Sequence, residues 1–405
     1  MKSSSDLPLA GVRVLELSQI MAGPTCGLML SDMGAEVIKI EKFPGGDDAR
    51  GYAKPGDPGL APGFLMLNRG KRSVAVDIRK PAGRQIIERL AARSDVVTEN
   101  FRRGKLDALG LGYEALRKIN PQLVYCSISG YGPTGPMADK GGFDLVLQAF
   151  SGLISVTGSG PDNLVKPGNS VSDINAGILA ALGVVTAYVK RLRTGEGSRV
   201  DTSLLQASMQ QMYWFAAAYF FNGAIAEPMG TAHPLIAPYQ TYKCRTGQIA
   251  LGGGNQANWK RIASVLDHPE WIDDVRFLTG RDRLANRDAL ERLITAELAK
   301  QDASHWISVF ESHDVPVGPV NNVKEAMEHP QTRAIDMVVD VEHPDGGTTR
   351  SLGCPIHFDG VAPHDTARAP HIGEHTFDVL KEAGFSTDEL TDLESQGIVL
   401  QHRVS

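Results

Sequence analysis

Strand and helix patterns alternate through the first third of this chain, and that alternation limits its fold more than any other feature. Short apolar strands are predicted at 12–17, 37–41, 73–77, 96–98 and 123–128, a helix at 24–33 and an amphipathic helix at 81–93. Strands that alternate with helices form βαβ units, whose right-handed crossovers build a mostly parallel sheet. The pattern therefore predicts an open, Rossmann-like parallel sheet in a large α/β domain.

The length of 405 residues exceeds what one small core needs, so a second domain is expected. The alternation of strand and helix patterns ends near Gly223, where prolines interrupt the sequence. A strand pair around 239–251 and helices near 259–266, 287–300 and 303–313 follow. We predict a large domain over 1–222, a smaller α+β domain over 223–330, and a return to the large domain over 331–405.

Charge is unevenly distributed along the chain. The whole protein has a net charge of -6, which argues against a nucleic-acid binder. Residues 1–200 nevertheless carry 25 Lys and Arg against 19 Asp and Glu. A basic half in an acidic protein suggests an anionic ligand on that half, although chance drift explains the counts almost as well.

One carboxylate, Asp173, stands directly before an apolar helical run at 174–189. A helix N-terminus favours the ionised carboxylate, which is the reactive form of a carboxylate nucleophile. Asp is also a preferred N-cap residue, so an ordinary helix cap is the alternative. The run is too short and too rich in glycine for a membrane span, and we read it as a buried helix.

Several site classes lack their sequence patterns. The first strand is not followed by GxGxxG, so a dinucleotide fingerprint is absent. All eleven histidines lie at His233 or later, and neither HExxH nor a metal-binding cysteine cluster occurs. We therefore expect no metal and no permanently bound cofactor. The N-terminus lacks an apolar signal core, and the four cysteines are widely spaced, which favours reduced thiols in a cytoplasmic protein.

Eight separated segments together resemble the class III coenzyme A transferases, the family of formyl-CoA transferase and carnitine CoA-transferase. They include VRVLELSQIMAGP (12–24), MGAEVIKIE (33–41), NRGKRSVAVD (68–77), SISGYGPTGP (127–136), the Asp173 segment and IGEHT (372–376). They follow the family order over nearly the whole chain. The resemblance implies a homodimer of interlocked rings, with the large domain built from both ends of the chain.

The resemblance also implies a reaction. The family aspartate that matches Asp173 attacks an acyl-CoA thioester, giving a mixed anhydride and then an aspartyl-CoA thioester, from which an acceptor carboxylate takes the CoA. The expected function is CoA transfer from an acyl-CoA, with succinyl-CoA as one candidate donor, to a carboxylic acid. The expected partners are these small molecules and a second copy of the chain, with no nucleic acid and no membrane.

The matching positions supply a candidate set for coenzyme A. Basic residues must gather near the phosphates of this ligand. The loop at 129–136 is a turn-forming segment that either closes over the CoA or is purely structural. The candidate CoA-site residues are Ile20, Lys42, Lys71, Arg72, Asn100, Phe101, Lys140 and Asp144.

Other positions depart from the family pattern. Met21 stands where formyl-CoA transferase has a glutamine, Ala108 stands where it has an arginine, and the segment 233–238 replaces its tetraglycine loop. These differences argue against oxalate as acceptor. His233 is a candidate acceptor contact or a simple turn residue, and the role of the GGGN run at 252–255 stays open.

Two other functions compete with CoA transfer. An α-methylacyl-CoA racemase needs the histidine of a GHD motif, but this chain has Gly142, Phe143 and Asp144 there, and phenylalanine carries no proton. A CoA-binding paralogue without turnover is the second alternative. The retained Asp173 argues weakly against it.

Overall fold

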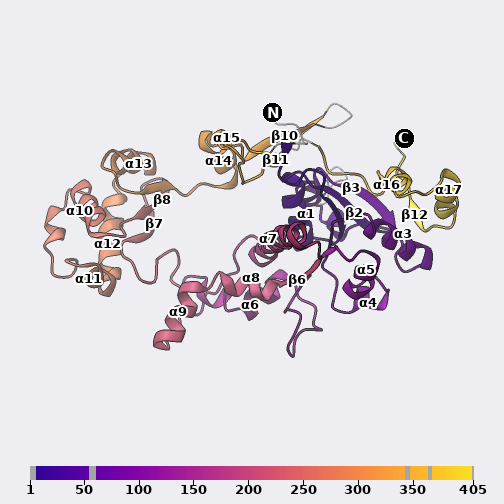
Figure 1. The fold of residues 1–405 in the computed structure, drawn as a ribbon. Helices are drawn as coiled ribbons and strands as arrows, with labels where there is room; N and C mark the ends of the chain where they lie inside the picture. The colour runs from indigo at the N-terminus through magenta and orange to yellow at the C-terminus, as the bar shows by residue number, and fades with distance from the viewer. Residues whose placement is uncertain (1–5, 54–60, 343–346, 364–366, 404–405) are drawn as a thin grey trace. The chain divides into compact units, whose positions relative to one another are not determined.

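The computed structural model describes residues 6–53, 61–342, 347–363 and 367–403. The chain forms two compact units (Figure 1). The larger unit comprises 1–153, 167–223 and 330–405, and the smaller comprises 154–166 and 224–329. The excursion at 154–166 was not predicted. Within this excursion, Gly158 pairs with Leu164 in a short bridge. The carbonyl of Gly158 accepts the N–H of Gly230 at 2.7 Å, and this contact links the excursion to the rest of the smaller unit.

A seven-stranded sheet forms the centre of the larger unit, in the order β12-β3-β2-β1-β4-β5-β6. Six strands are parallel, and β12 joins antiparallel to β3. The predicted large parallel α/β sheet is confirmed, in the doubly wound order. The strands are β1 (Arg13–Leu17), β2 (Glu36–Lys42), β3 (Arg72–Val76), β4 (Val96–Glu99), β5 (Val124–Ser129), β6 (Ser198–Ser203) and β12 (Val399–Leu400).

Helices cover both faces of this sheet, as βαβ crossovers require. One core joins Leu15, Val74 and Val97 to α3, α5, α16 and α17, and the other joins Val14 and Val124 to α1, α7 and α8. The helices are α1 (Ala22–Asp32), α2 (Pro62–Asn68), α3 (Pro81–Ala91), α4 (Lys105–Ala108), α5 (Tyr113–Ile119), α6 (Asp144–Phe150), α7 (Val171–Thr194), α8 (Leu204–Gln210), α9 (Tyr213–Asn222), α15 (Pro330–Ala334), α16 (Thr376–Glu382) and α17 (Thr387–Ser395).

Helix α7 packs closely on α1 because its inner residues are small. A Cβ placed on Gly177 would lie 2.5 Å from the carbonyl oxygen of Ala22 and 2.6 Å from Cβ of Thr25. By length and composition α7 is apolar enough to cross a membrane. Its buried residues, among them Ala176, Ala180 and Val184, instead form part of the core beside the sheet.

The C-terminal part of the chain rejoins the larger unit through its last strand. Strands β10 (Val338–Glu342) and β11 (Thr348–Leu352) form a separate two-stranded sheet, pairing with no other strand among the described residues. The short strand β12 completes the main sheet, with Val399 opposite Val76. This edge strand was not predicted, because two residues are too few for a visible pattern.

The smaller unit combines an antiparallel sheet, β7-β8-β9, with helices around its own core. Trp259, Phe277 and Phe310 are fully buried there. Its elements are β7 (Tyr239–Lys243), β8 (Gln248–Gly252), β9 (Val317–Pro319), α10 (Gln256–Val265), α11 (Gly280–Ala285), α12 (Arg287–Leu298), α13 (Ala303–Ser312) and α14 (Val323–Glu328).

Candidate functional site

Two neighbouring cavities open at the carboxyl ends of β1 and β4, where the strand order of a doubly wound sheet reverses and ligands bind. A cavity of about 450 Å³ is lined by the turns after these strands and by Asp173. A cavity of about 670 Å³ extends along the ends of β2 and β3. Gln19, Phe101 and Lys105 line both. We call them the Asp173 cavity and the β2–β3 cavity.

Asp173 lies in the first turn of α7, two residues after the helix begins. The N-cap is Ser170, so the interpretation of Asp173 as a plain N-cap is wrong. The Asp173 side chain lines its cavity. Within the described part of the chain, no hydrogen-bond donor is bound to its carboxyl group. The carboxyl is therefore open to a ligand in the cavity.

Asp144, at the start of α6, caps α7 from outside. Its Oδ1 accepts the backbone N–H of Ser172 at 3.0 Å and that of Asp173 at 3.3 Å, and its Oδ2 accepts from Gln148 Nε2 at 2.6 Å. The N–H groups at a helix start are the ones that lack partners within the helix. Asp144 thus takes up two N–H groups at the start of α7, where a helix start favours a negative charge.

Burial raises the pKa of Asp173 from 3.8 to about 7, and the nearby negative charge of Asp144 contributes to this rise. Loss of water around the carboxyl therefore acts against the ionised form that the helix start was expected to favour. A carboxyl that is half protonated near neutral pH, in a cavity, is a common mark of a functional group.

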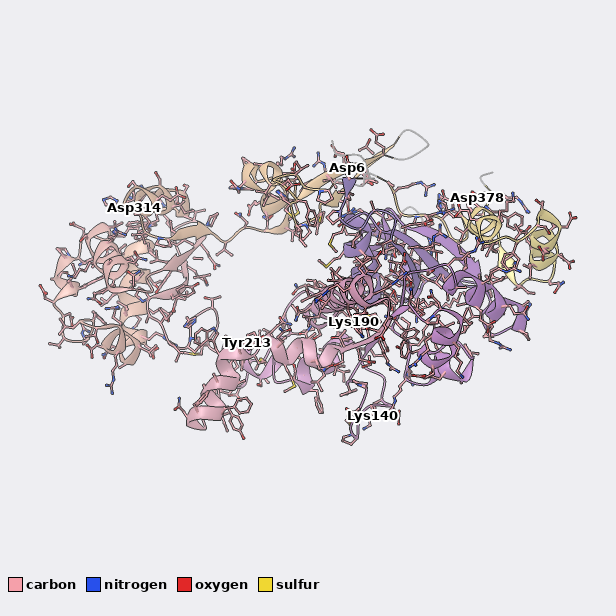
Figure 2. The ribbon with its side chains drawn as sticks, viewed as in Figure 1. Asp6, Lys140, Lys190, Tyr213, Asp314 and Asp378 are labelled. Carbon is pink, nitrogen blue, oxygen red and sulfur yellow. The ribbon has the colours of Figure 1, made fainter. Side chains whose placement is uncertain are left out.

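The structure brings five of the other candidates to the two cavities. Ile20, Asn100 and Lys140 line the Asp173 cavity, Lys42 lines the β2–β3 cavity, and Phe101 lines both. Lys140, labelled in Figure 2, is exposed. Asn100 also binds the turn between β1 and α1. Its side-chain oxygen accepts the N–H of Gln19, and its side-chain nitrogen donates to the carbonyl of Gln19.

Lys71 and Arg72 are not brought to either cavity. Lys71 is fully buried, with Nζ 2.9 Å from Glu16 Oε2, so it has no free ammonium for a ligand. Arg72 binds Glu382 at 2.8 Å and also Glu36. The loop expected to present both side chains is too short, because β3 begins at Arg72 itself.

Three basic residues of the Asp173 cavity were missed. Arg102, Arg103 and Lys105 follow β4 directly and line that cavity. The run RRGK at 102–105 was the available signal, because residues directly after a parallel strand face the switch point. Ala108, which stands where formyl-CoA transferase has an arginine, lines the β2–β3 cavity.

In the smaller unit, the GGGN run supports the segment that replaces the tetraglycine loop. The N–H of Gly253 donates to the carbonyl of Pro238 at 2.8 Å, and a Cβ on Gly253 would lie 2.6 Å from Cγ of Pro238. Nδ1 of His233 accepts the N–H of Leu235 at 3.1 Å, which is a turn contact. Among the residues that the structure describes, no group of three metal-ligating side chains is found.

A titratable carboxyl in the switch-point cavity of a doubly wound α/β domain marks a candidate active site. The model of CoA-transferase family III matches residues 9–376. A human protein named succinyl-CoA:glutarate CoA-transferase is 37% identical over 396 residues, which cover 98% of this chain and 90% of that protein. The chain belongs to CoA-transferase family III and is a CoA-transferase, as the sequence predicted.

Further relatives support this family assignment. A protein of Agrobacterium fabrum named succinate–glutarate CoA-transferase is 36% identical over 381 residues, 93% of this chain and 95% of that one. A crystal structure of a CAIB/BAIF family protein from Brucella suis has a TM-score of 0.84 and 37% sequence identity, covering 93% of this chain and 99% of that chain.

We predict that the rate of CoA transfer rises with pH through an apparent pKa near 7. The carboxylate is the nucleophilic form, so at pH 6 only roughly a tenth of Asp173 is ionised when its pKa is about 7. The measurement is kcat/KM for an acyl-CoA between pH 5 and 9. Asp144→Asn keeps the acceptor oxygen for α7 but removes the charge, so it shifts the acid limb to lower pH. An acid limb that Asp144→Asn leaves in place contradicts the assignment.

Proposed function

We propose that this chain moves CoA from succinyl-CoA to a dicarboxylic acid of the glutarate type, with Asp173 as the covalent carrier. The main support for this proposal is the position of the Asp173 carboxyl. It lines the switch-point cavity, and no donor among the described residues forms a hydrogen bond with it. The substrates are inferred from the names of relatives 36–37% identical to this chain. Met21, Ala108 and the 233–238 segment support an acceptor other than oxalate.

In the first half-reaction, an Asp173 oxygen attacks the thioester carbonyl of succinyl-CoA. The C–S bond breaks, the CoA thiolate leaves, and a mixed anhydride of Asp173 and succinate remains. The thiolate then attacks the aspartyl carbonyl, which releases succinate and leaves an aspartyl-CoA thioester. Succinate carries away one oxygen that had belonged to Asp173.

In the second half-reaction, the acceptor carboxylate attacks the aspartyl-CoA thioester and displaces the thiolate. The thiolate attacks the acceptor side of the new anhydride, which forms the product acyl-CoA and restores the Asp173 carboxylate with one oxygen from the acceptor. Each step exchanges one activated acyl group for another, so no external acid or oxidant is needed. Exclusion of water from the cavity would protect the two anhydrides and the thioester from hydrolysis.

The two cavities divide the coenzyme between them in this proposal. The β2–β3 cavity takes the nucleotide end, and the Asp173 cavity takes the thioester end, with Phe101 between them. In this proposal the phosphates face Lys42 and Lys105, which line the β2–β3 cavity, and Arg102 from the neighbouring lining of the Asp173 cavity. Lys42 contacts Asp48 in the free protein and would exchange that exposed partner for a phosphate.

We further propose that the enzyme is a cytoplasmic homodimer of interlocked chains. Helix α9 has no buried residue, and its Phe220 and Phe221 are 77% and 84% exposed (Figure 2 labels Tyr213 at its start). Leu182 and Leu192 on α7 are also exposed. Large exposed apolar side chains gathered on a helix such as α9 mark an interaction site, and a second copy of the chain would cover them.

We predict that Asp173→Asn, which matches aspartate in shape, lowers CoA transfer by at least about 10³-fold, because a neutral amide is a poor nucleophile. The affinity for CoA stays within roughly threefold, because the substitution leaves the β2–β3 cavity intact. Transfer is measured by mass spectrometry of the acyl-CoA products with succinyl-CoA and a panel of dicarboxylic acids.

The covalent route has its own readout. With an ¹⁸O-labelled acceptor acid, one labelled oxygen should appear in the peptide that contains Asp173 and then in released succinate. Transfer by the wild-type enzyme with no label at Asp173 would falsify the aspartyl route while leaving the CoA-transferase class intact.

We predict that Arg102→Ala and Lys105→Ala each raise KM for the acyl-CoA roughly tenfold with little change in kcat. A hydrogen bond to a charged phosphate contributes about 1.5–3 kcal/mol, and about 1.4 kcal/mol corresponds to a factor of ten. Lys118→Ala, on an exposed residue of α5 outside both cavities, is the matched control. Equal KM values for all three variants would exclude Arg102 and Lys105 as phosphate contacts.

We predict a particle of twice the chain mass of 43.6 kDa that does not dissociate on dilution, because interlocked chains separate only by unfolding. Sedimentation analysis from micromolar to nanomolar concentration tests this prediction. A species of one chain mass anywhere in that range, with folded circular dichroism, contradicts the interlocked dimer.

A further inference from the structure

We propose that a buried network of Glu16, Lys39, Asp47 and Lys71 positions the turn between β1 and α1 for the reaction at Asp173. Asp47 is the positioning residue that holds the turn directly. The turn, residues 18–21, lines the Asp173 cavity through Gln19, Ile20 and Met21. The inference rests on the proposed function, because it assigns this turn to the same site.

The turn needs to be held, because its backbone is strained. Ile20 has φ +70°, a conformation that is unfavourable for a β-branched side chain. Such residues persist only where the surrounding structure fixes them, and they gather at functional sites. The strained residue here lies in the lining of the cavity that holds Asp173.

Two side chains from outside the turn fix it. Oδ1 of Asp47 accepts the N–H of Ile20 at 3.0 Å. The Asn100 amide, from the end of β4, accepts the N–H of Gln19 at 3.0 Å and donates to its carbonyl at 2.8 Å. Three consecutive hydrogen-bonding groups of the turn are thus bound by two side chains from different crossovers of the sheet.

The buried charges secure Asp47 in turn. Oδ2 of Asp47 lies 2.8 Å from Nζ of Lys39, which also lies 3.1 Å from Oε1 of Glu16 and 2.9 Å from the carbonyl oxygen of Ser18. These side chains are 0–1% exposed. The same ammonium therefore binds the carboxylate that holds the turn and the backbone where the turn begins.

Lys71 extends the network to the other side of the turn. Its Nζ lies 2.9 Å from Oε2 of Glu16 and 2.9 Å from the carbonyl oxygen of Pro24, in the first turn of α1. Gly27 of α1 leaves room for this arrangement, since a Cβ there would lie 1.8 Å from Oε2 of Glu16. The backbone is thus anchored to one set of buried charges both before and after Ile20.

A buried ion-pair network is poor support for stability alone, because well-packed apolar side chains of the same volume often serve equally well. What such a network adds is a fixed geometry, because each carboxylate and ammonium here binds a particular side-chain or backbone group. Misplacement of a reacting group by about 1 Å can cost about a hundredfold in rate. We infer that these charges serve the placement of the turn opposite Asp173.

The test is a double-mutant cycle between Asp47→Asn and Ile20→Gly, read as kcat per folded enzyme. Glycine adopts φ +70° without strain, so a turn that carries Ile20→Gly depends less on its clamp. We expect Asp47→Asn to lower kcat at least about tenfold when Ile20 is present and at most about threefold in the Ile20→Gly background. KM for succinyl-CoA should change little in either background.

Asp32→Asn is the matched control, because it breaks another buried ion pair, that of Asp32 with Arg69 at 2.5 Å, away from the turn. It should lower the unfolding temperature and leave kcat per folded enzyme unchanged. If Asp47→Asn does not fold, Asn100→Ala removes the other clamp without exposing a buried charge and enters the same cycle. Its kcat should fall at least about fivefold when Ile20 is present and less in the Ile20→Gly background.

The outcomes separate this inference from the proposed function. Wild-type enzyme that transfers no CoA from succinyl-CoA overturns the proposed function. Wild-type enzyme that transfers CoA, together with equal effects of the clamp substitutions with and without Ile20→Gly, overturns the positioning role and assigns the network to stability alone.

Discussion

The close contact between α1 and α7 is the constraint on which the site depends. Gly177 lets α7 approach the backbone of Ala22 at a distance that a Cβ would prevent. Asp173 precedes Gly177 by about one helical turn, and residues so spaced lie on the same helix face. The contact therefore brings the Asp173 carboxyl, the proposed nucleophile, to the β1–α1 turn, so this carboxyl and the switch-point cavity belong to one site.

The same packing sets the chemistry of the carboxyl group. A nucleophile must be ionised, but a buried carboxyl resists ionisation, and the pKa of Asp173 rises to about 7. Asp144 opposes ionisation further while it caps the helix. With a pKa of about 7, only about half of this poorly solvated group is the carboxylate at neutral pH. Such a group is more reactive toward a thioester than one surrounded by water and hydrogen-bond donors.

Around this site the structure uses buried charge to fix geometry. The strain at Ile20 costs about 1–3 kcal/mol. Asp47 and Asn100 offset it with three hydrogen bonds to the turn. Because the anchors come from the ends of β2 and β4 and from the segment before β3, the turn is fixed relative to the whole sheet rather than to its neighbours in sequence.

The first five strands of the main sheet and the family were readable from the sequence by itself. Strand periodicity is local, and the family segments keep their order along the chain. The burial and the ion-pair partners of Lys39 and Lys71 could not be predicted from the sequence. Lys39 alternates with Ile38 and Ile40, as in a half-exposed strand, yet helices cover both faces of the sheet and it is fully buried. Only the tertiary structure decided which charges face a ligand and which face each other, because pairing and loss of water depend on residues distant in sequence.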